Sequence, residues 1–195
     1  MVSNPSLFVL DTNVWSHFAT KRPSPQMIAW LNDLGTPVAI PVGAIIEIER
    51  GIKNIAEKNP ERSKFLREWL NSILASNVRF LGMDLPTAQL YAHMTSLPAL
   101  RNLWLPSSFA KNPKLGEDLS IAASAIVHKA PIATMNIRHF LQIHEHFKLP
   151  GLYNPMDAKW LVRPVWTDSV PFANRVQPTV AVSAVVFDHL AELNQ

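Results

Sequence analysis

Short apolar runs of strand length recur along this chain, and most are followed by polar residues and then by a stretch with helical spacing. A run without polar alternation is typical of a strand that is buried on both faces of a parallel sheet. The first run, Leu7–Leu10, ends at Asp11, and a later one, Pro131–Thr134, ends at Met135 and Asn136. Strands that alternate with helices predict an α/β fold, with a doubly wound parallel sheet of four to five strands flanked by helices.

The remaining elements follow from the same patterns. Amphipathic spacing and end signals predict the helices, and prolines mark a loop at Leu97–Pro113. The further strands expected are Pro37–Ile40, Val78–Leu81 and an edge strand at Leu149–Tyr153, and the helices expected are Pro25–Leu34, Val42–Glu57, Glu61–Ala75, Asp84–Ser96, Leu115–Lys129 and Arg138–His146.

Composition indicates a globular chain. Its 195 residues suit one domain with an appendage, and 48% hydrophobic against 17% charged residues argues against disorder. The net charge of +3 is too small to indicate nucleic-acid binding by itself, although a nuclease needs only a local basic patch. The chain has no cysteine, which excludes disulfides, thiolate metal sites and a cysteine nucleophile, and fits a reducing compartment.

Two further expectations concern location and domain organisation. No apolar run approaches the ~20 residues of a membrane helix, and the first residues lack a signal-peptide pattern, so we expect a soluble cytoplasmic protein. After Asn154-Pro155 the composition shifts toward prolines and aromatic residues. We therefore expect a domain over residues 6–157 and a C-terminal extension of unknown role over 158–195, packed on the domain or on a second copy.

Polar residues cluster where the predicted strands end. Asp11 follows the first strand, Glu47 lies early in the helix after the second, Asp118 lies in the first turn of a helix, and Asn136 follows Pro131–Thr134. All four are expected at the same edge of a parallel sheet, where ligands bind. Gathered carboxylates repel unless a cation neutralises them, and oxygen ligands select Mg²⁺ or Mn²⁺. Such ions activate water and stabilise a phosphate under attack.

Simpler interpretations remain open for each residue. Asp11 can be a helix cap, and Asp118 can simply favour the positive end of a helix dipole. Glu47 and Glu49 are two residues apart and point to nearly opposite sides of a helix, so at most one joins a site. Other doubly wound enzymes fit poorly: a haloacid-dehalogenase-type phosphatase needs an acid where Asn13 stands, and a dinucleotide enzyme needs a glycine-rich first turn.

Four segments together resemble PIN-domain proteins, especially VapC-type toxins and their FitB-like relatives. Leu7–Val14 resembles the opening strand with its Asp-Thr-Asn end, and Ile46–Ile52 looks like the second motif, which places the acidic ligand of the family on Glu47. Asp118–Ala123 is similar to the third motif, and Ala133–Phe140 to the fourth. The resemblance covers Leu7–Asp157, and Leu152–Pro155 also resembles the closing motif.

The sequence departs from the family pattern at two positions. Met135 replaces a common arginine, and His139 stands where an aspartate is usual. The site is then expected to hold three carboxylates with Asn136 nearby, which predicts a weaker second metal position. His139 is interpreted as a surface histidine in preference to a phosphate ligand.

The resemblance implies a PIN-like three-layer fold and a Mg²⁺- or Mn²⁺-dependent endoribonuclease that is the toxin of a type II toxin–antitoxin pair. Asp11, Glu47 and Asp118 would hold the metal, and Asn136 would assist in catalysis. The expected partners are an RNA substrate, a cognate antitoxin protein and a second copy in a homodimer. The alternative is a catalytically weakened PIN-like module that binds RNA or a protein partner.

Overall fold

A six-stranded sheet forms the centre of the molecule in the computed structural model, which describes residues 5–106 and 115–164. The strand order is β3-β2-β1-β4-β5-β6, and all neighbours are parallel except β5 and β6, which are antiparallel. The strands are β1 (Phe8–Leu10), β2 (Val38–Pro41), β3 (Arg79–Leu81), β4 (Ile132–Ala133), β5 (Leu152–Asn154) and β6 (Lys159–Val162).

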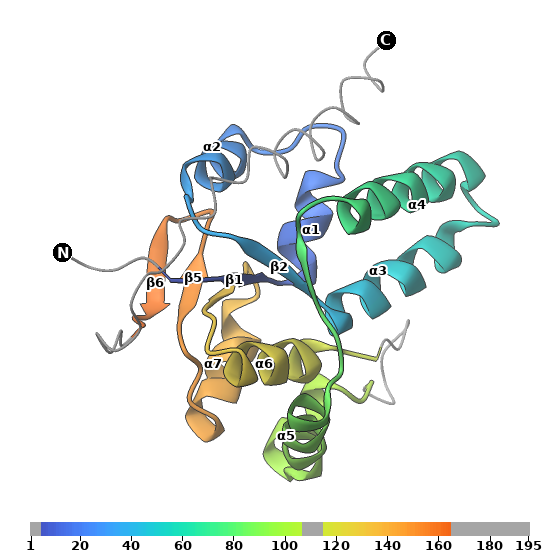
Figure 1. Ribbon diagram of the computed structural model, residues 1–195. Coiled ribbons are helices and arrows are strands. Elements are labelled where there is room, and N and C mark those ends of the chain that lie inside the picture. Colours follow the sequence, from blue (N-terminus) through green and yellow to red (C-terminus); the bar gives the residue numbers. More distant parts are fainter. Residues whose placement is uncertain (1–4, 107–114, 165–195) are drawn as a thin grey trace.

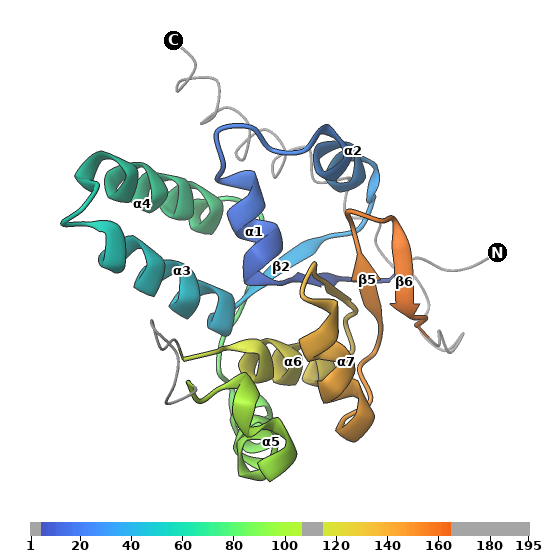
Figure 2. The same cartoon turned by 180° about the vertical axis from the view of Figure 1, so that it is seen from behind.

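Helices cover both faces of this sheet. α1, α2 and α4 lie on one side, and α5, α6 and α7 lie on the other, which gives three layers (Figures 1 and 2). The helices are α1 (Thr12–Phe18), α2 (Pro25–Asp33), α3 (Val42–Ile55), α4 (Pro60–Ala75), α5 (Leu85–Ser96), the 3₁₀ helix η1 (Pro98–Leu103), α6 (Asp118–Val127) and α7 (Ile137–His146). The expected α/β class with a mostly parallel sheet is confirmed.

The core explains why the strands read as continuous apolar runs. Every residue of β1 is buried, and Val9 and Leu10 are fully inaccessible to solvent. α6 is buried along nearly its whole length because its own side chains are mostly small or aliphatic on every side of the helix. That helix is consequently fixed against the sheet, and so is Asp118 at its first turn.

The structure differs from the sequence-based expectations at the edges of the sheet. The sheet has six strands, and β6 continues it past residue 157. β5 was expected at the edge but lies inside the sheet, because β6 pairs with it along its outer side. The sequence pattern does not predict β6, because its residues are exposed or half-buried and do not form a buried apolar run.

Two further boundaries are corrected. The segment Leu97–Pro113, expected to be a loop, contains η1, whose proline occupies the first helical position. α6 begins at Asp118 and not at Leu115. The expectations for residues 165–195 lie outside the described residues. Within the described ranges, no helix has the length and apolarity needed to span a membrane.

Candidate active site

Asp11 is held at the end of β1 by a set of short hydrogen bonds. Its carboxylate accepts from the backbone N–H of Thr12 at 2.6 Å, which caps α1, and from Asn13 Nδ2 at 2.6 Å. Thr134 Oγ1 donates to Asp11 Oδ2 at 2.6 Å from the end of the neighbouring strand β4. Asp11 is only 2% exposed, so a carboxylate is fixed in a buried position with its orientation set by three donors.

Thr134 and Asn13 tie the ends of β1 and β4 together. Thr134 is fully buried, and its Oγ1 also accepts from the backbone N–H of Asn136 at 2.8 Å. Asn13 Oδ1 accepts from the backbone N–H of Met135 at 3.1 Å. Neither residue is assigned a role in the site from the sequence alone. Both lie close to the ends of predicted strands, and that position could have indicated such a role.

Glu47 reaches from α3 toward the start of α6. Its Oε1 accepts from the backbone N–H of Glu117 at 3.2 Å, and Glu117 in turn pairs with Arg50 at 2.6 Å. Gly116, just before α6, packs closely against the end of η1, because a Cβ there would lie 2.0 Å from the carbonyl oxygen of Leu103. Glu49 points elsewhere and pairs with an arginine of α4, as expected for two residues that are two apart on a helix.

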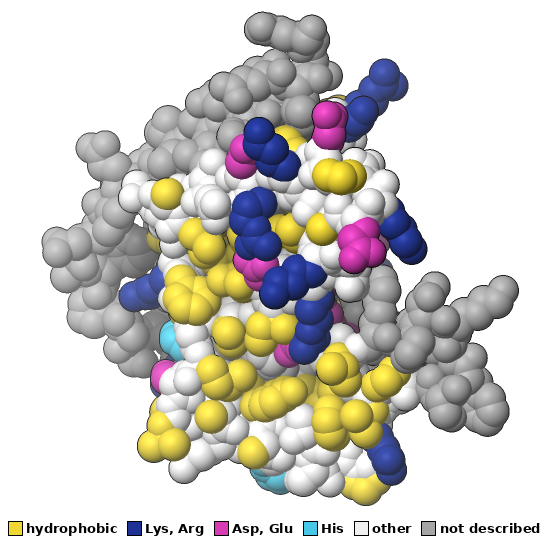
Figure 3. Space-filling view, turned by 90° about the vertical axis from the view of Figure 1, so that its right-hand side faces the viewer, with side chains coloured by type: hydrophobic (Ala, Val, Ile, Leu, Met, Phe, Trp, Pro, Cys, Tyr) yellow, Lys and Arg dark blue, Asp and Glu magenta, His cyan; other side chains and the backbone are white. Residues whose placement is uncertain are grey.

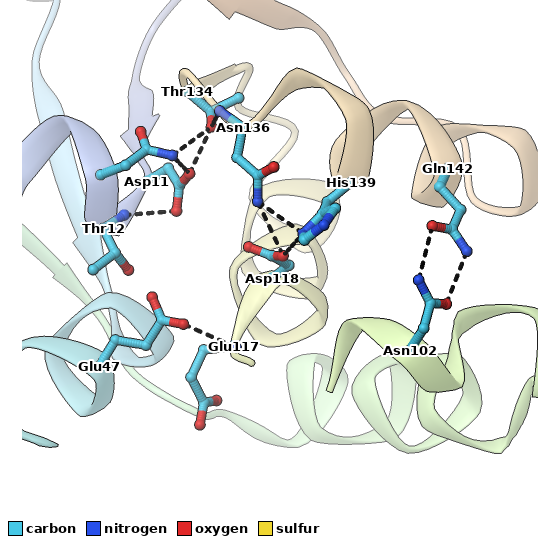
Figure 4. A network of polar contacts seen from close by, with 11 residues as sticks. Asp11, Thr12, Glu47, Asn102, Glu117, Asp118, Thr134, Asn136, His139 and Gln142 are labelled. Atoms are coloured by element: carbon cyan, nitrogen blue, oxygen red, sulfur yellow. Dashed lines mark hydrogen bonds and ion pairs between the residues drawn. The ribbon is translucent and has the colours of Figure 1, made fainter. Parts of the chain in front are cut away.

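Asp118 meets two residues at the start of α7. Its Oδ2 lies 2.7 Å from His139 Nδ1 and 3.3 Å from Asn136 Nδ2. Asn136 Nδ2 is also 2.9 Å from His139 Nδ1. His139 is partly exposed, as the interpretation of a surface histidine requires, but its ring also contacts Asp118 directly. Figure 4 shows this cluster beside Asp11 and Glu47.

Burial and mutual repulsion disfavour the charged forms of these carboxyl groups. Burial, then the charge of Asp118, raises the pKa of Asp11 to about 7. Burial also raises the pKa of Glu47, and the charge of Asp118 adds to this effect. Burial raises the pKa of Asp118, although the contact with His139 opposes the rise. A cation would relieve the cost of ionising all three groups.

All four candidate residues from the sequence line one pocket of about 680 Å³. It is bordered by the end of β1, by α3, by η1 and the segment before α6, and by the start of α6 and α7, and Arg50, Asn102 and His139 are among its other lining residues. Within residues 5–106 and 115–164, however, no three Asp, Glu or His side chains form a ready-made metal cage.

The donor set still fits a hard divalent cation. Mg²⁺ is usually bound through one or two carboxylates and keeps several of its waters, so a complete protein cage is unnecessary. Asp11, Glu47 and Asp118 supply oxygen ligands around one pocket, and burial raises the pKa of all three, with the charge of Asp118 adding to the rise at Asp11 and Glu47. The residues present therefore fit Mg²⁺ or Mn²⁺, with water completing the coordination.

The pKa of Asp11 predicts an unusual pH dependence of stability without metal. The folded state keeps a proton on Asp11 up to about pH 7, whereas the unfolded chain loses it near its ordinary value of 3.8. The free energy of unfolding should therefore fall as pH rises between these values, by up to about 4 kcal/mol if this group acts alone.

Urea unfolding in a chelator between pH 4 and pH 8 measures this slope. Asp11→Asn should flatten it, and the matched control Asp33→Asn, at an exposed position on α2, should leave it unchanged. A wild-type protein that becomes more stable over this pH range would contradict the prediction.

Comparisons with known proteins agree with the fold. The model of the PIN domain family matches residues 8–145. FitAcB from Neisseria gonorrhoeae is 24% identical, with a TM-score of 0.54, and the match covers 76% of this chain and 98% of that one. VapBC2 from Rickettsia felis, solved bound to a promoter DNA fragment, is 20% identical with a TM-score of 0.52, over 70% and 92% of the chains. A comparison with curated proteins gave no match.

Proposed function

Because the chain belongs to the PIN domain family, whose members are generally nucleases, we propose that it is a Mg²⁺- or Mn²⁺-dependent endoribonuclease. The observation that carries the proposal is the pocket lined by Asp11, Glu47 and Asp118, in which burial raises the pKa of all three carboxyl groups and the charge of Asp118 raises that of the other two further. Such a concentration of carboxylates costs stability and is of use where a divalent cation must be held.

Each residue contributes a definite task to this chemistry. Asp11, Glu47 and Asp118 would hold the metal, which when bound would supply an activated water and positive charge beside the scissile phosphate. Thr134 and Asn13 fix the orientation of the Asp11 carboxylate through hydrogen bonds of 2.6 Å each. A side chain held in one orientation loses little entropy on ligand binding, so these contacts favour a reproducible site.

Asn136 has the polarity to orient a water molecule in the pocket. Its backbone N–H is fixed by Thr134 at 2.8 Å, and its side chain lies at the pocket wall next to Asp118. An amide both donates and accepts, so it can position an attacking water without changing protonation state.

Positive charge near the pocket supports a nucleic-acid substrate. Arg50 lines the pocket, where it pairs with Glu117. Figure 3 shows a band of Lys and Arg side chains, with Asp and Glu side chains among them, across the face that carries α3 and α4. Phosphate contacts act locally, so such a patch can bind RNA in a chain with a net charge of only +3.

A protein partner is the second part of the proposal. The similar structures are named for two-component assemblies, VapBC and FitAB, and one carries promoter DNA. By analogy, this chain is a toxin that a cognate antitoxin inhibits, and it acts as a homodimer in the cytoplasm. Co-purification with a small DNA-binding protein encoded beside it would support that role.

The test of activity is cleavage of RNA by the purified chain. A labelled single-stranded RNA should be cut internally in Mg²⁺ or Mn²⁺, and excess EDTA should stop the reaction. A single-stranded DNA of the same sequence should be cut far more slowly. Cleavage that persists undiminished in EDTA would contradict the proposed mechanism.

One observation favours the alternative of a weakened, non-catalytic module. His139 occupies a position where the family commonly has an aspartate, and it binds Asp118 directly. If this contact neutralises Asp118 permanently, the chain should bind RNA without cutting it. RNA binding measured by fluorescence anisotropy, with no cleavage in either metal, would select this alternative.

A further inference from the structure

Three polar side-chain atoms from α6 and the start of α7 converge at the wall of the pocket. Asp118 Oδ2 and His139 Nδ1 are 2.7 Å apart, His139 Nδ1 and the amide nitrogen of Asn136 are 2.9 Å apart, and that amide nitrogen is 3.3 Å from Asp118 Oδ2. The three atoms form a closed triangle, which Figure 4 shows beside Asp11 and Glu47.

Hydrogen bonds can satisfy two sides of this triangle but not the third. His139 Nδ1–H and the amide N–H of Asn136 can both donate to Asp118 Oδ2, but the 2.9 Å contact between the two nitrogens then joins two donors. A neutral imidazole nitrogen is a donor or an acceptor and not both. If the amide group of Asn136 is turned by half a rotation, its oxygen faces His139 Nδ1. The oxygens of Asp118 and Asn136 then compete for the single proton on that nitrogen.

A cation satisfies all three residues at once, because Asp118 Oδ2, His139 Nδ1 and, with the amide turned, the side-chain oxygen of Asn136 can each offer a lone pair. Two ligands about 2.1 Å from an octahedral ion and at right angles to each other are about 3.0 Å apart, which is close to the sides of this triangle. His139 is 41% exposed, so the imidazole can keep its remaining proton on Nε2 toward solvent while Nδ1 binds the ion.

We propose that Asp118, Asn136 and His139 form a mixed nitrogen–oxygen site for a first-row transition-metal ion such as Mn²⁺, Co²⁺ or Ni²⁺, in preference to Mg²⁺. Imidazole suits these ions, whereas Mg²⁺ takes oxygen ligands and keeps its waters. The role of the ion in RNA cleavage rests on the proposed function, but its binding does not. Asp118 would join this site to the carboxylates of Asp11 and Glu47 in the same pocket.

The experiment compares metal binding by three proteins prepared without a polyhistidine tag. These are the wild type, His139→Asp, which supplies oxygen in place of nitrogen, and His146→Gln, a control at an exposed histidine of the same helix. Calorimetric titrations with Ni²⁺ and Mg²⁺ give the ratio of their affinities. Pulsed electron paramagnetic resonance of bound Mn²⁺ reports directly on coupling to an imidazole nitrogen.

Wild type and His146→Gln should both show nitrogen coupling, and His139→Asp should lack it. His139→Asp should also reduce the preference for Ni²⁺ over Mg²⁺ by about tenfold or more, because the imidazole is the ligand that discriminates between them. Bound Mn²⁺ without nitrogen coupling in the wild type, or an unchanged affinity ratio in His139→Asp, would overturn the proposal.

The outcomes separate this proposal from that of nuclease activity. Nitrogen coupling in a protein that cuts no RNA supports the mixed site and contradicts the proposed function. Metal-dependent cleavage without nitrogen coupling supports the function and overturns the mixed site. A protein that binds none of these ions contradicts both.

Discussion

The Asp11→Asn variant should cleave RNA about three orders of magnitude more slowly than the wild type at saturating Mg²⁺. Asp11 is the most buried of the three carboxylates, and three donors hold it in place. Bound metal contributes several kcal/mol to the stabilisation of charge in the transition state, and each 1.36 kcal/mol changes the rate about tenfold. Initial rates on a labelled RNA measure the loss.

The asparagine side chain keeps the size of the carboxylate, so the fold should persist. Its oxygen can still accept from Thr134 and Asn13, and only the bond from the backbone N–H of Thr12 is lost. Circular dichroism should match the wild type, and Asp33→Asn should cleave at the wild-type rate. A rate within threefold of wild type in a folded Asp11→Asn protein would remove Asp11 from the mechanism.

Truncation of Trp15 to alanine should destabilise the protein by about 3–5 kcal/mol, the usual cost of a large cavity in a core. Trp15 is fully buried on α1, the helix that Asp11 caps. Domains of this size are stable by roughly 5–15 kcal/mol, so the variant should lose a large share of its stability. Urea unfolding at constant pH and metal concentration measures the change.

Two variants distinguish a cavity from a lost polar contact. Among the residues that the structure describes, Trp15 Nε1 has no hydrogen-bond partner, so Trp15→Phe should cost much less than Trp15→Ala. Leu85→Ala changes a side chain that is 71% exposed and should shift stability by no more than about 0.5 kcal/mol. Equal losses in Trp15→Phe and Trp15→Ala would contradict the packing argument.

The sheet could be predicted from sequence where its strands are buried on both sides. Helices cover both faces of the sheet at Phe8–Leu10 and Val38–Pro41. These strands are therefore apolar throughout, and their composition alone predicts them. Lys159–Val162 could not be found in this way. It is a partly exposed edge strand, and its place depends on antiparallel pairing with β5 and not on its own pattern.

The same holds at the site: residues with a local sequence signal were predictable, and contacts that only the tertiary fold brings together were not. Asp11 and Asn136 were predictable because residues that end parallel strands gather at one edge of a sheet. The contact of Thr134 with Asp11 spans 123 positions in the chain, and the pairing of Arg50 with Glu117 spans 67, so neither leaves a local signal. His139 lies three residues after Asn136 in the first turn of α7, and that spacing could have indicated their shared side.

The most direct test of the metal-centred account is a calorimetric titration of the purified chain with Mn²⁺ at pH 8, alongside the triple variant Asp11→Asn, Glu47→Gln, Asp118→Asn. These substitutions remove the three negative charges but keep the side-chain volumes. The account predicts saturable binding by the wild type and none by a folded triple variant. Equal binding by both proteins, or no binding by the wild type, would contradict it.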